Sequence, residues 1–274
     1  MMKLRSSLLA AAIFAAASAL CVHAVAQTPA PTYQPAEGQA GKDVMWIPTS
    51  EVLVDRMLEM AKLTPQDYLV DLGSGDGRLV ITAAKRGAIA HGIEYNADLV
   101  ALSRRAAQAE GVSTRATFQK ADIFESDFSR ATVVTMFLLP ELNMRLRPTL
   151  LAMKPGTRIV SNSFNLEDWV PDQVQRVVEG CRTYCEAYQW TVPAQVAGTW
   201  QLGNGQELVL EQTFQMLKGT LRQRGQAFPL RDARMTGTQI QFTVDGLRYA
   251  GEVMGRDMQG RVNGGSAWKA TRGP

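Results

Sequence analysis

The sequence predicts an α/β domain built on a doubly wound, mostly parallel sheet, followed by a small antiparallel all-β domain. Two observations predict this order. Short apolar runs alternate with helical segments over residues 44–192, as in strands joined by helical crossovers. Over residues 193–274, apolar and polar residues alternate between turn signals. That pattern is typical of a meander, which closes as a small barrel or packs as a sandwich.

The first 26 residues have the pattern of a secretory signal peptide. Basic residues precede an apolar run and a small-residue cleavage site: Lys3, Arg5, Leu8–Leu20 and Ala24–Ala26. The run is shorter than the roughly 20 residues that span a membrane. We therefore expect a mature chain that begins near Gln27, has no transmembrane segment, and is periplasmic or secreted. Residues 27–43, rich in Pro, Ala, Gln and Gly, are predicted to form a flexible linker.

Charge and composition exclude several classes of partner. The formal charge of the 274 residues is +3, and it falls by two to +1 when Lys3 and Arg5 leave with the signal. So small a charge does not indicate a nucleic-acid partner. No spacing of histidines and cysteines predicts a metal site.

Cys181 and Cys185 remain in the mature chain, either as a disulfide across a turn or as free thiols. Nothing indicates an oligomeric state.

Five strands and four helices are expected in the first domain. The expected strands are residues 68–72, 88–94, 117–121, 132–138 and 157–162. The expected helices are residues 51–63 with Ser50 as N-cap, 78–85, 97–109, and 141–153 with an interruption at Pro148. In such sheets ligands bind beyond the carboxyl ends of the strands, where the strand order reverses. Residues that follow the strands are therefore the candidate site.

A glycine-rich loop follows the first strand. Strand one ends at a carboxylate, Asp71, and glycines stand at alternate positions up to Gly77. Glycine admits positive φ and leaves the backbone open to a ligand. A dinucleotide-binding loop would carry its third glycine three positions after Gly75, where Arg78 stands. The loop also lacks the lysine of a phosphate-binding P-loop, so NAD, FAD and nucleoside triphosphates are disfavoured.

The segment resembles the class I S-adenosylmethionine-dependent methyltransferases, which carry an acidic residue followed by G-x-G-x-G. The resemblance implies S-adenosyl-L-methionine as cofactor, with Asp71 near its ammonium group. Glu94 then accepts hydrogen bonds from the ribose, and Asp122 meets the adenine amino group. The cofactor-binding residues implied in this segment and at the two following strand ends are Asp71, Gly73, Ser74, Gly75, Gly77, Glu94, Asp122 and Ile123.

A narrower resemblance covers residues 46–169. The pieces that carry it are Ile47–Thr49, Asp71–Val80, Gly92–Asn96 and Phe137–Pro140. They are similar to the lysine N-methyltransferases that act on the ATP synthase c subunit and the adenine nucleotide translocase. In that family the segment with Pro48 and Thr49 closes over the cofactor, so both residues are expected in the pocket. The chain departs from the family at Trp46, in its secretory signal and in its β-domain, so the methyl acceptor does not follow from the resemblance.

Methyl transfer is an in-line displacement that requires a nucleophile near attack distance and exclusion of water. A lysine, the acceptor that the resemblance implies, must be deprotonated by desolvation or by a nearby acceptor. Glu141 is the candidate catalytic acceptor, although it equally suits a helix start. Tyr95 is a second candidate, either lining the pocket or only packing.

Other functions stay open from the sequence. A small-molecule O- or N-methyltransferase is one alternative, and a secreted binding protein that retains the fold without chemistry is another. The β-domain is predicted to dock the substrate or a partner.

Overall fold

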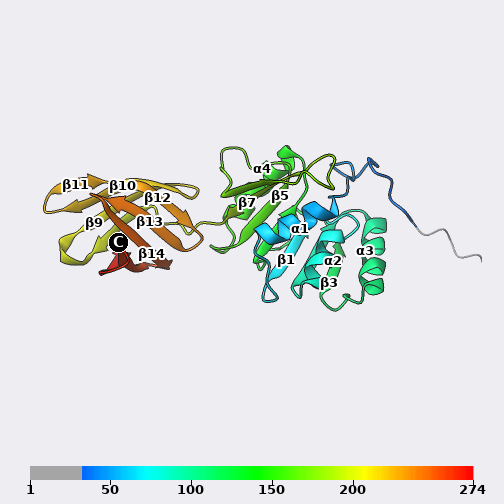
Figure 1. The fold of residues 1–274 in the computed structure, drawn as a ribbon, viewed down its shortest axis with the longest axis horizontal. Coiled ribbons are helices and arrows are strands. Elements are labelled where there is room, and N and C mark those ends of the chain that lie inside the picture. Colours follow the sequence, from blue (N-terminus) through cyan, green and yellow to red (C-terminus); the bar gives the residue numbers. More distant parts are fainter. Residues whose placement is uncertain (1–32, 274) are drawn as a thin grey trace, which may run out of the picture. The chain divides into compact units, whose positions relative to one another are not determined.

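The computed structural model describes residues 33–273. The predicted signal peptide, residues 1–26, and the first part of the predicted linker lie outside the described residues. The described chain forms a mixed sheet with four helices and then an antiparallel sheet (Figure 1). No helix within residues 33–273 combines the length and the apolar character needed to cross a membrane.

The first sheet has seven strands in the order β3-β2-β1-β4-β5-β7-β6. Their bounds are β1 (Tyr68–Leu72), β2 (Ile89–Glu94), β3 (Ala116–Lys120), β4 (Val133–Met136), β5 (Arg158–Asn162), β6 (Gln173–Arg176) and β7 (Glu186–Thr191). Strands β1 to β5 are parallel, whereas β7 runs antiparallel to both β5 and β6. The strand order reverses between β1 and β4, where ligands of such sheets bind.

Helices cover both faces of this sheet. They are α1 (Glu51–Met60), α2 (Arg78–Lys85), α3 (Ala97–Ala109) and α4 (Pro140–Leu151). Successive strand residues point to opposite faces. Leu69 accordingly packs in the cluster that contains the buried residues of α1, α2 and α3, whereas Val70 packs in the cluster that contains those of α4. The predicted doubly wound sheet is therefore confirmed.

Several details of the first domain differ from the prediction. Helix α4 continues through Pro148 instead of being interrupted there. Pro148 is exposed, so water can satisfy the carbonyl that loses its helical N–H partner. Helix α1 ends at Met60, and Lys62 has φ +48°. Ser50 occupies the N-cap position, but its hydroxyl makes no capping hydrogen bond. Strands β6 and β7 were not predicted.

The antiparallel sheet closes into a barrel. Its strands are β8 (Gly198–Leu202), β9 (Glu207–Thr213), β10 (Met216–Gln223), β11 (Gln226–Pro229), β12 (Arg231–Thr236), β13 (Gln239–Val244), β14 (Leu247–Met254), β15 (Asp257–Val262) and β16 (Ala267–Arg272). Neighbouring strands pair from β12 to β16, β16 pairs with β8, β8 pairs with β9, and β10 pairs with both β9 and β12. These pairings complete a ring of eight strands, to which β11 adds as a hairpin on β10.

Aromatic side chains form much of the barrel core. Phe242 stacks on Tyr249 with ring centroids 4.8 Å apart, and Trp268 meets both rings edge-on. Trp200 is fully buried and donates its indole N–H to the Val196 carbonyl at 2.8 Å. The two tryptophans that bracket the domain in the sequence are therefore part of its core, which is the common role of tryptophan in a small barrel.

Substitution of Gly77 would show how tightly the loop between β1 and α2 is packed. Its φ is +82°, and an added Cβ would lie 2.7 Å from the Phe118 ring and 2.8 Å from Ser103 Cβ. We expect Gly77→Ala to lower the free energy of unfolding by about 3 kcal/mol, because backbone strain and overpacking add. Urea denaturation followed by circular dichroism would measure the loss.

Gly111→Ala is the matched control for Gly77→Ala. Gly111 has φ +69° and nothing within 4 Å of an added Cβ, so its substitution carries the backbone cost alone. That cost is about 1 kcal/mol. Equal losses in the two variants would show that the contacts of Gly77 with Phe118 and Ser103 do not constrain the fold.

Candidate functional site

A cavity of about 470 Å³ lies at the carboxyl ends of the parallel strands. Loops after β1, β2, β3, β4 and β5 line it, together with residues 39–49, which precede α1. Ten residues singled out in the sequence lie in its wall: Pro48, Thr49, Asp71, Gly73, Ser74, Gly75, Glu94, Tyr95, Asp122 and Ile123. The structure therefore brings together residues that are up to 75 positions apart in the sequence, since the wall runs from Pro48 to Ile123 among this set.

Two of the expected site residues lie elsewhere. Gly77 is not in the wall; it precedes α2 at positive φ and packs against Phe118. Glu141 stands in the first turn of α4, where it is exposed and does not line the cavity. Its carboxylate therefore suits the positive end of the helix dipole rather than catalysis. The structure does not support Glu141 as the proton acceptor.

Glu94 and Ser103 hold the glycine loop in place. The Glu94 carboxylate accepts the Gly75 N–H at 2.9 Å and the Asn96 N–H at 2.8 Å. The buried Ser103 hydroxyl donates to the Gly75 carbonyl at 3.0 Å. Gly73 and Gly75 have φ +76° and +55°, which glycine adopts at little cost. Ser103 was not predicted, because nothing in its helix distinguishes it from a surface serine.

Asp71 is a buried carboxyl at the centre of the site. Thr135, on the neighbouring strand β4, donates its hydroxyl to Asp71 Oδ1 at 2.7 Å. Burial raises the pKa of Asp71 to about 7, despite this hydrogen bond, and the negative charges of Glu94 and Asp76 raise it further. Such a group gains from a cation placed beside it, because the cation stabilises the ionised form.

Residues 39–49 form the other wall of the cavity. Lys42 binds the Asp122 carboxylate, and this ion pair holds the pKa of Asp122 below its usual range. The Lys42 ammonium also lies 4.8 Å from the centroid of the Tyr95 ring. Trp46 covers the glycine loop so closely that a Cβ on Gly75 would lie 2.8 Å from its indole nitrogen. The last five residues of the predicted linker, 39–43, thus line the site.

Polar and apolar groups divide along the strand order. Side chains at the ends of β2 and β3 include the polar groups of Glu94, Tyr95 and Asp122, beside the apolar Ala121 and Ile123. On the side of β4, β5 and β7 the wall is apolar or aromatic: Met136, Phe137, Leu138, Leu139, Leu142, Phe164 and Tyr184. Carboxylates outnumber basic side chains in the whole wall, with Asp43, Asp71, Asp76, Glu94 and Asp122 against Lys42 and Arg78. The residues described include no cluster of three or more His, Cys, Asp or Glu suited to a metal ion.

Comparison with known proteins assigns the fold to a family. The family model described as the ANTKMT methyltransferase domain matches residues 71–173. A protein-lysine N-methyltransferase from Saccharolobus islandicus is 45% identical over 140 residues, which are 50% of this chain and 87% of that protein. This chain belongs to the ANTKMT methyltransferase family. It is an S-adenosylmethionine-dependent methyltransferase, as the glycine loop and the strand-end carboxylates predicted.

Other relatives of this ANTKMT-family methyltransferase include animal enzymes and a solved structure. A Homo sapiens lysine N-methyltransferase, named for the C subunit of ATP synthase, is 35% identical over 130 residues, which span 47% of this chain and only 55% of that enzyme. The crystal structure of an RNA methyltransferase from Salinibacter ruber, in complex with S-adenosyl-L-homocysteine, is 45% identical. It matches with a TM-score of 0.51 and covers 55% of this chain and 96% of that chain.

The cavity of this ANTKMT-family methyltransferase fits its cofactor. S-adenosylmethionine carries an ammonium and a sulfonium, which suit a wall rich in carboxylates and a buried carboxyl, Asp71. Positive-φ glycines at 73 and 75 open the backbone to a ligand. The Ser74 hydroxyl is buried without a hydrogen-bond partner among the described residues and lines the same cavity. The structure thus offers charge, space and a free polar group.

The raised pKa of Asp71 predicts a pH dependence of cofactor binding. A cofactor ammonium beside Asp71 favours its ionised form, so below about pH 7 binding must displace a proton. We expect the affinity for S-adenosylhomocysteine to fall by up to about tenfold per pH unit below pH 7, and to level off above it. Titration calorimetry between pH 5.5 and 8.5 would measure this slope.

Asp71→Asn provides the control for that slope. The amide keeps the size and a hydrogen-bonding oxygen but does not titrate, so we expect weaker binding that is independent of pH over the same range. An unchanged slope in this variant would assign the pH dependence to another group.

Proposed function

We propose that this enzyme transfers the methyl group of S-adenosylmethionine to the side-chain amine of a lysine in a protein. The observation that carries the proposal is the 45% identity, over 87% of its length, with a protein-lysine N-methyltransferase. The acidic cavity supports it, because a lysine side chain approaches as a cation. The animal relatives named as lysine N-methyltransferases agree in acceptor chemistry, although this chain spans about half of their length.

In this proposal three carboxylates each bind a different part of the cofactor. Asp71 takes the ammonium of the methionyl group, because it is the buried carboxyl at the point where the strand order reverses. Glu94 meets the ribose hydroxyls at the end of β2, and Asp122 meets the adenine amino group beyond β3. Ile123 packs on the adenine ring, while Pro48 and Thr49 cover the cofactor from the segment before α1.

The apolar half of the cavity supplies what the acceptor amine needs. A lysine ammonium cannot attack, so after the side chain has bound as a cation it must lose its proton to water before transfer, and burial among apolar groups lowers its pKa. Phe137, Leu138 and Phe164 line this half of the wall. Desolvation there therefore promotes the neutral amine without Glu141. The same apolar wall excludes water, which would otherwise stabilise the ammonium.

Transfer of a labelled methyl group tests the proposal directly. The purified protein, incubated with methyl-labelled S-adenosylmethionine and a periplasmic extract, should label material that protease destroys and ribonuclease spares. Acid hydrolysis should then yield methylated lysine. Label confined to RNA, or to small molecules that pass a dialysis membrane, would contradict a protein-lysine acceptor.

Gly75→Arg serves as the inactive variant for the transfer experiment. Gly75 has φ +55°, and Trp46 lies against the position of its missing side chain. We expect this variant to bind S-adenosylhomocysteine at least about 100-fold more weakly, because the new side chain fills the cavity. Gly111→Arg, at a positive φ in open space, should transfer methyl groups at the wild-type rate.

We also propose that the enzyme is exported and works in the periplasm or outside the cell. The N-terminal sequence pattern supports export. A disulfide joins Cys181 and Cys185, and such bonds persist mainly in oxidising compartments. Of the two possibilities left by the sequence, the structure thus has the paired cysteines, which agrees with export.

The mass of the mature protein would test export. We expect the protein recovered from the periplasmic fraction to begin at Gln27 and to weigh two hydrogens less than its fully reduced form. Intact mass spectrometry with and without reductant measures both features. Recovery from the cytoplasm with Met1 still present would contradict the proposal.

A further inference from the structure

Three aromatic side chains gather on the apolar half of the cavity. Phe137 directly follows β4, Phe164 follows β5, and Tyr184 precedes β7. The ring centroid of Tyr184 lies 5.2 Å from that of Phe137 and 6.0 Å from that of Phe164, and the two phenylalanine centroids are 6.2 Å apart. We call these three residues the aromatic wall. All three line the cavity.

The aromatic wall is not part of the hydrophobic core. Phe137 and Phe164 are partly buried, and Tyr184 exposes 40% of its surface. Rings that only complete a core are normally buried, so their remaining exposure towards the cavity leaves surface for a ligand. Aromatic faces attract cations, and they also pack against methylene groups. A lysine side chain offers both an ammonium and methylene groups.

Tyr184 is held in an unfavourable backbone conformation. Its φ is +57°, a left-handed value that costs a residue with a bulky side chain about 1–2 kcal/mol. Residues kept in such conformations by their surroundings are concentrated at binding sites. At Tyr184, the backbone conformation is accompanied by a side chain directed at the cavity wall. The backbone conformation of Tyr184 therefore places a side chain at the cavity as well as reversing the chain direction.

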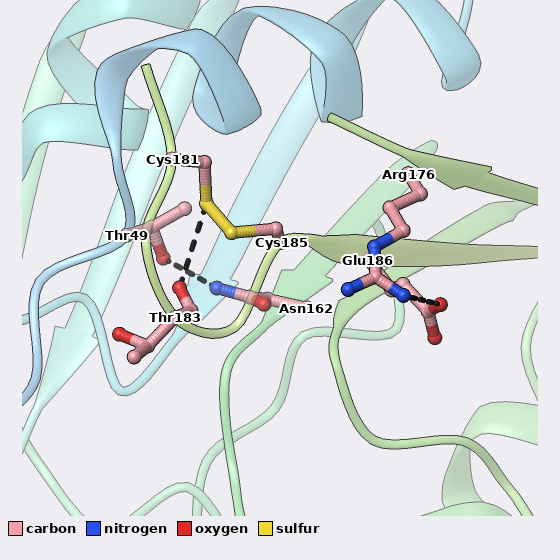
Figure 2. Close-up of a disulfide and its surroundings, with 7 residues drawn as sticks. All are labelled: Thr49, Asn162, Arg176, Cys181, Thr183, Cys185 and Glu186. Atoms are coloured by element: carbon pink, nitrogen blue, oxygen red, sulfur yellow. Dashed lines mark hydrogen bonds and ion pairs between the residues drawn. A yellow bond between two sulfur atoms is a disulfide. The ribbon is translucent and has the colours of Figure 1, made fainter. Parts of the chain in front are cut away.

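The disulfide encloses Tyr184 in a short loop. Cys181 and Cys185 bracket the residue, and the Val177 N–H donates to the Cys185 carbonyl at 2.9 Å. Figure 2 shows the disulfide beside Thr49 and Asn162, whose side-chain amide donates to the Thr49 hydroxyl at 3.1 Å. Thr49 lines the cavity. The loop is thus fixed where the cover of the cavity meets the end of β5.

The start of α1 supports the same loop from the other side. A Cβ on Gly180 would lie 3.2 Å from Val52, which shows how closely the loop approaches the helix. On the strand side, the Ser163 N–H donates to the Glu186 carbonyl at 2.8 Å. The disulfide, the close approach to α1 and the hydrogen bond between Val177 and Cys185 hold the loop at three points and so position Tyr184.

We propose that Phe137, Phe164 and the disulfide-held Tyr184 form the subsite that binds the alkylammonium side chain of the methyl acceptor. This inference rests on the proposed lysine acceptor. The subsite lies on the β4–β5–β7 side of the strand-order reversal, opposite the polar side assigned to the cofactor. Tyr184 provides the partly exposed face at its entrance, and the loop 177–185 positions it.

A two-part ligand tests the subsite without requiring turnover. The probe is an S-adenosylhomocysteine analogue in which nitrogen replaces sulfur and carries a 4-aminobutyl arm in place of the transferable methyl group. We expect the arm to raise affinity for the wild-type protein about tenfold over S-adenosylhomocysteine, measured by calorimetry. A butyl arm without the amine should give a smaller gain. A wild-type protein that gains nothing from the aminobutyl arm overturns the proposal.

Variants of the loop 177–185 show whether the gain in affinity from the aminobutyl arm depends on Tyr184. Tyr184→Ala should remove most of the tenfold gain while leaving the affinity for S-adenosylhomocysteine unchanged, and Tyr184→Phe should retain most of it. The double variant Cys181→Ser with Cys185→Ser should also lose the gain, because it frees Tyr184. Unchanged affinity for S-adenosylhomocysteine in each variant shows that it has folded. If Tyr184→Ala keeps the full gain, Tyr184 has no part in the subsite.

The two proposals fail in different ways. Methyl label on lysine, together with an arm gain that does not depend on Tyr184, would overturn the subsite and leave the lysine acceptor standing. A Tyr184-dependent gain, with label found only on another acceptor, would overturn the lysine acceptor and retain an alkylammonium-binding surface.

Discussion

The hydrogen bond from Thr135 to Asp71 joins the two strands between which the order of the sheet reverses. Loops diverge on either side of that reversal, which leaves room for a ligand between them. Burial at this point raises the pKa of Asp71 to about 7, and the negative charges of Glu94 and Asp76 raise it further. The hydroxyl of Thr135 stabilises the ionised carboxylate in part, and a cation beside Asp71 would stabilise it more.

The reversal of the strand order separates two functions of a methyltransferase, namely binding of the cofactor and binding of the methyl acceptor. In the proposed assignment, polar groups that follow β1, β2 and β3 recognise the amino acid, the ribose and the base of the cofactor. The proposed acceptor, a lysine amine, needs the opposite environment, because water would keep it charged. Aromatic and aliphatic side chains after β4 and β5 provide that environment. The sheet topology thus places each task on its own set of loops.

Apart from Pro48 and Thr49, which the family resemblance implied, the part of the site that the sequence predicted depends on strand ends. Asp71, Glu94 and Asp122 were found because each follows an apolar run, and the direction of parallel strands brings such positions together. Lys42 and Tyr184 could not be found in this way. One lies in a stretch whose composition resembles a linker, and the other becomes part of the wall only through the antiparallel strand β7. Glu141 does not line the cavity, because a place near a strand end did not fix where its side chain lies.

Among the elements of the fold, the long periodic segments were predictable and the polar strands were not. The sequence of β6, Gln173–Arg176, has no buried side chain, so no strand was expected there. Its place is fixed by pairing with β7 rather than by its own composition. Pro148 predicted an interruption of the helix that the structure does not have. Helix α4 continues through Pro148, because this residue is exposed and water can satisfy the carbonyl that lacks a helical N–H partner.

Closure of the β8–β16 barrel has a consequence for recognition. The ring of pairings from β8 through β16, completed by β9 with β10, leaves no open edge in the ring itself. Around most of the ring, backbone groups that an open sheet would present to an incoming strand are already paired; between β10 and β12 the ladder is short, with Met216 opposite Arg234. Away from that seam, a partner must be recognised by outward-facing side chains. Substitution of single surface residues can therefore change which partner is recognised, while the hydrogen bonds between the strands stay intact.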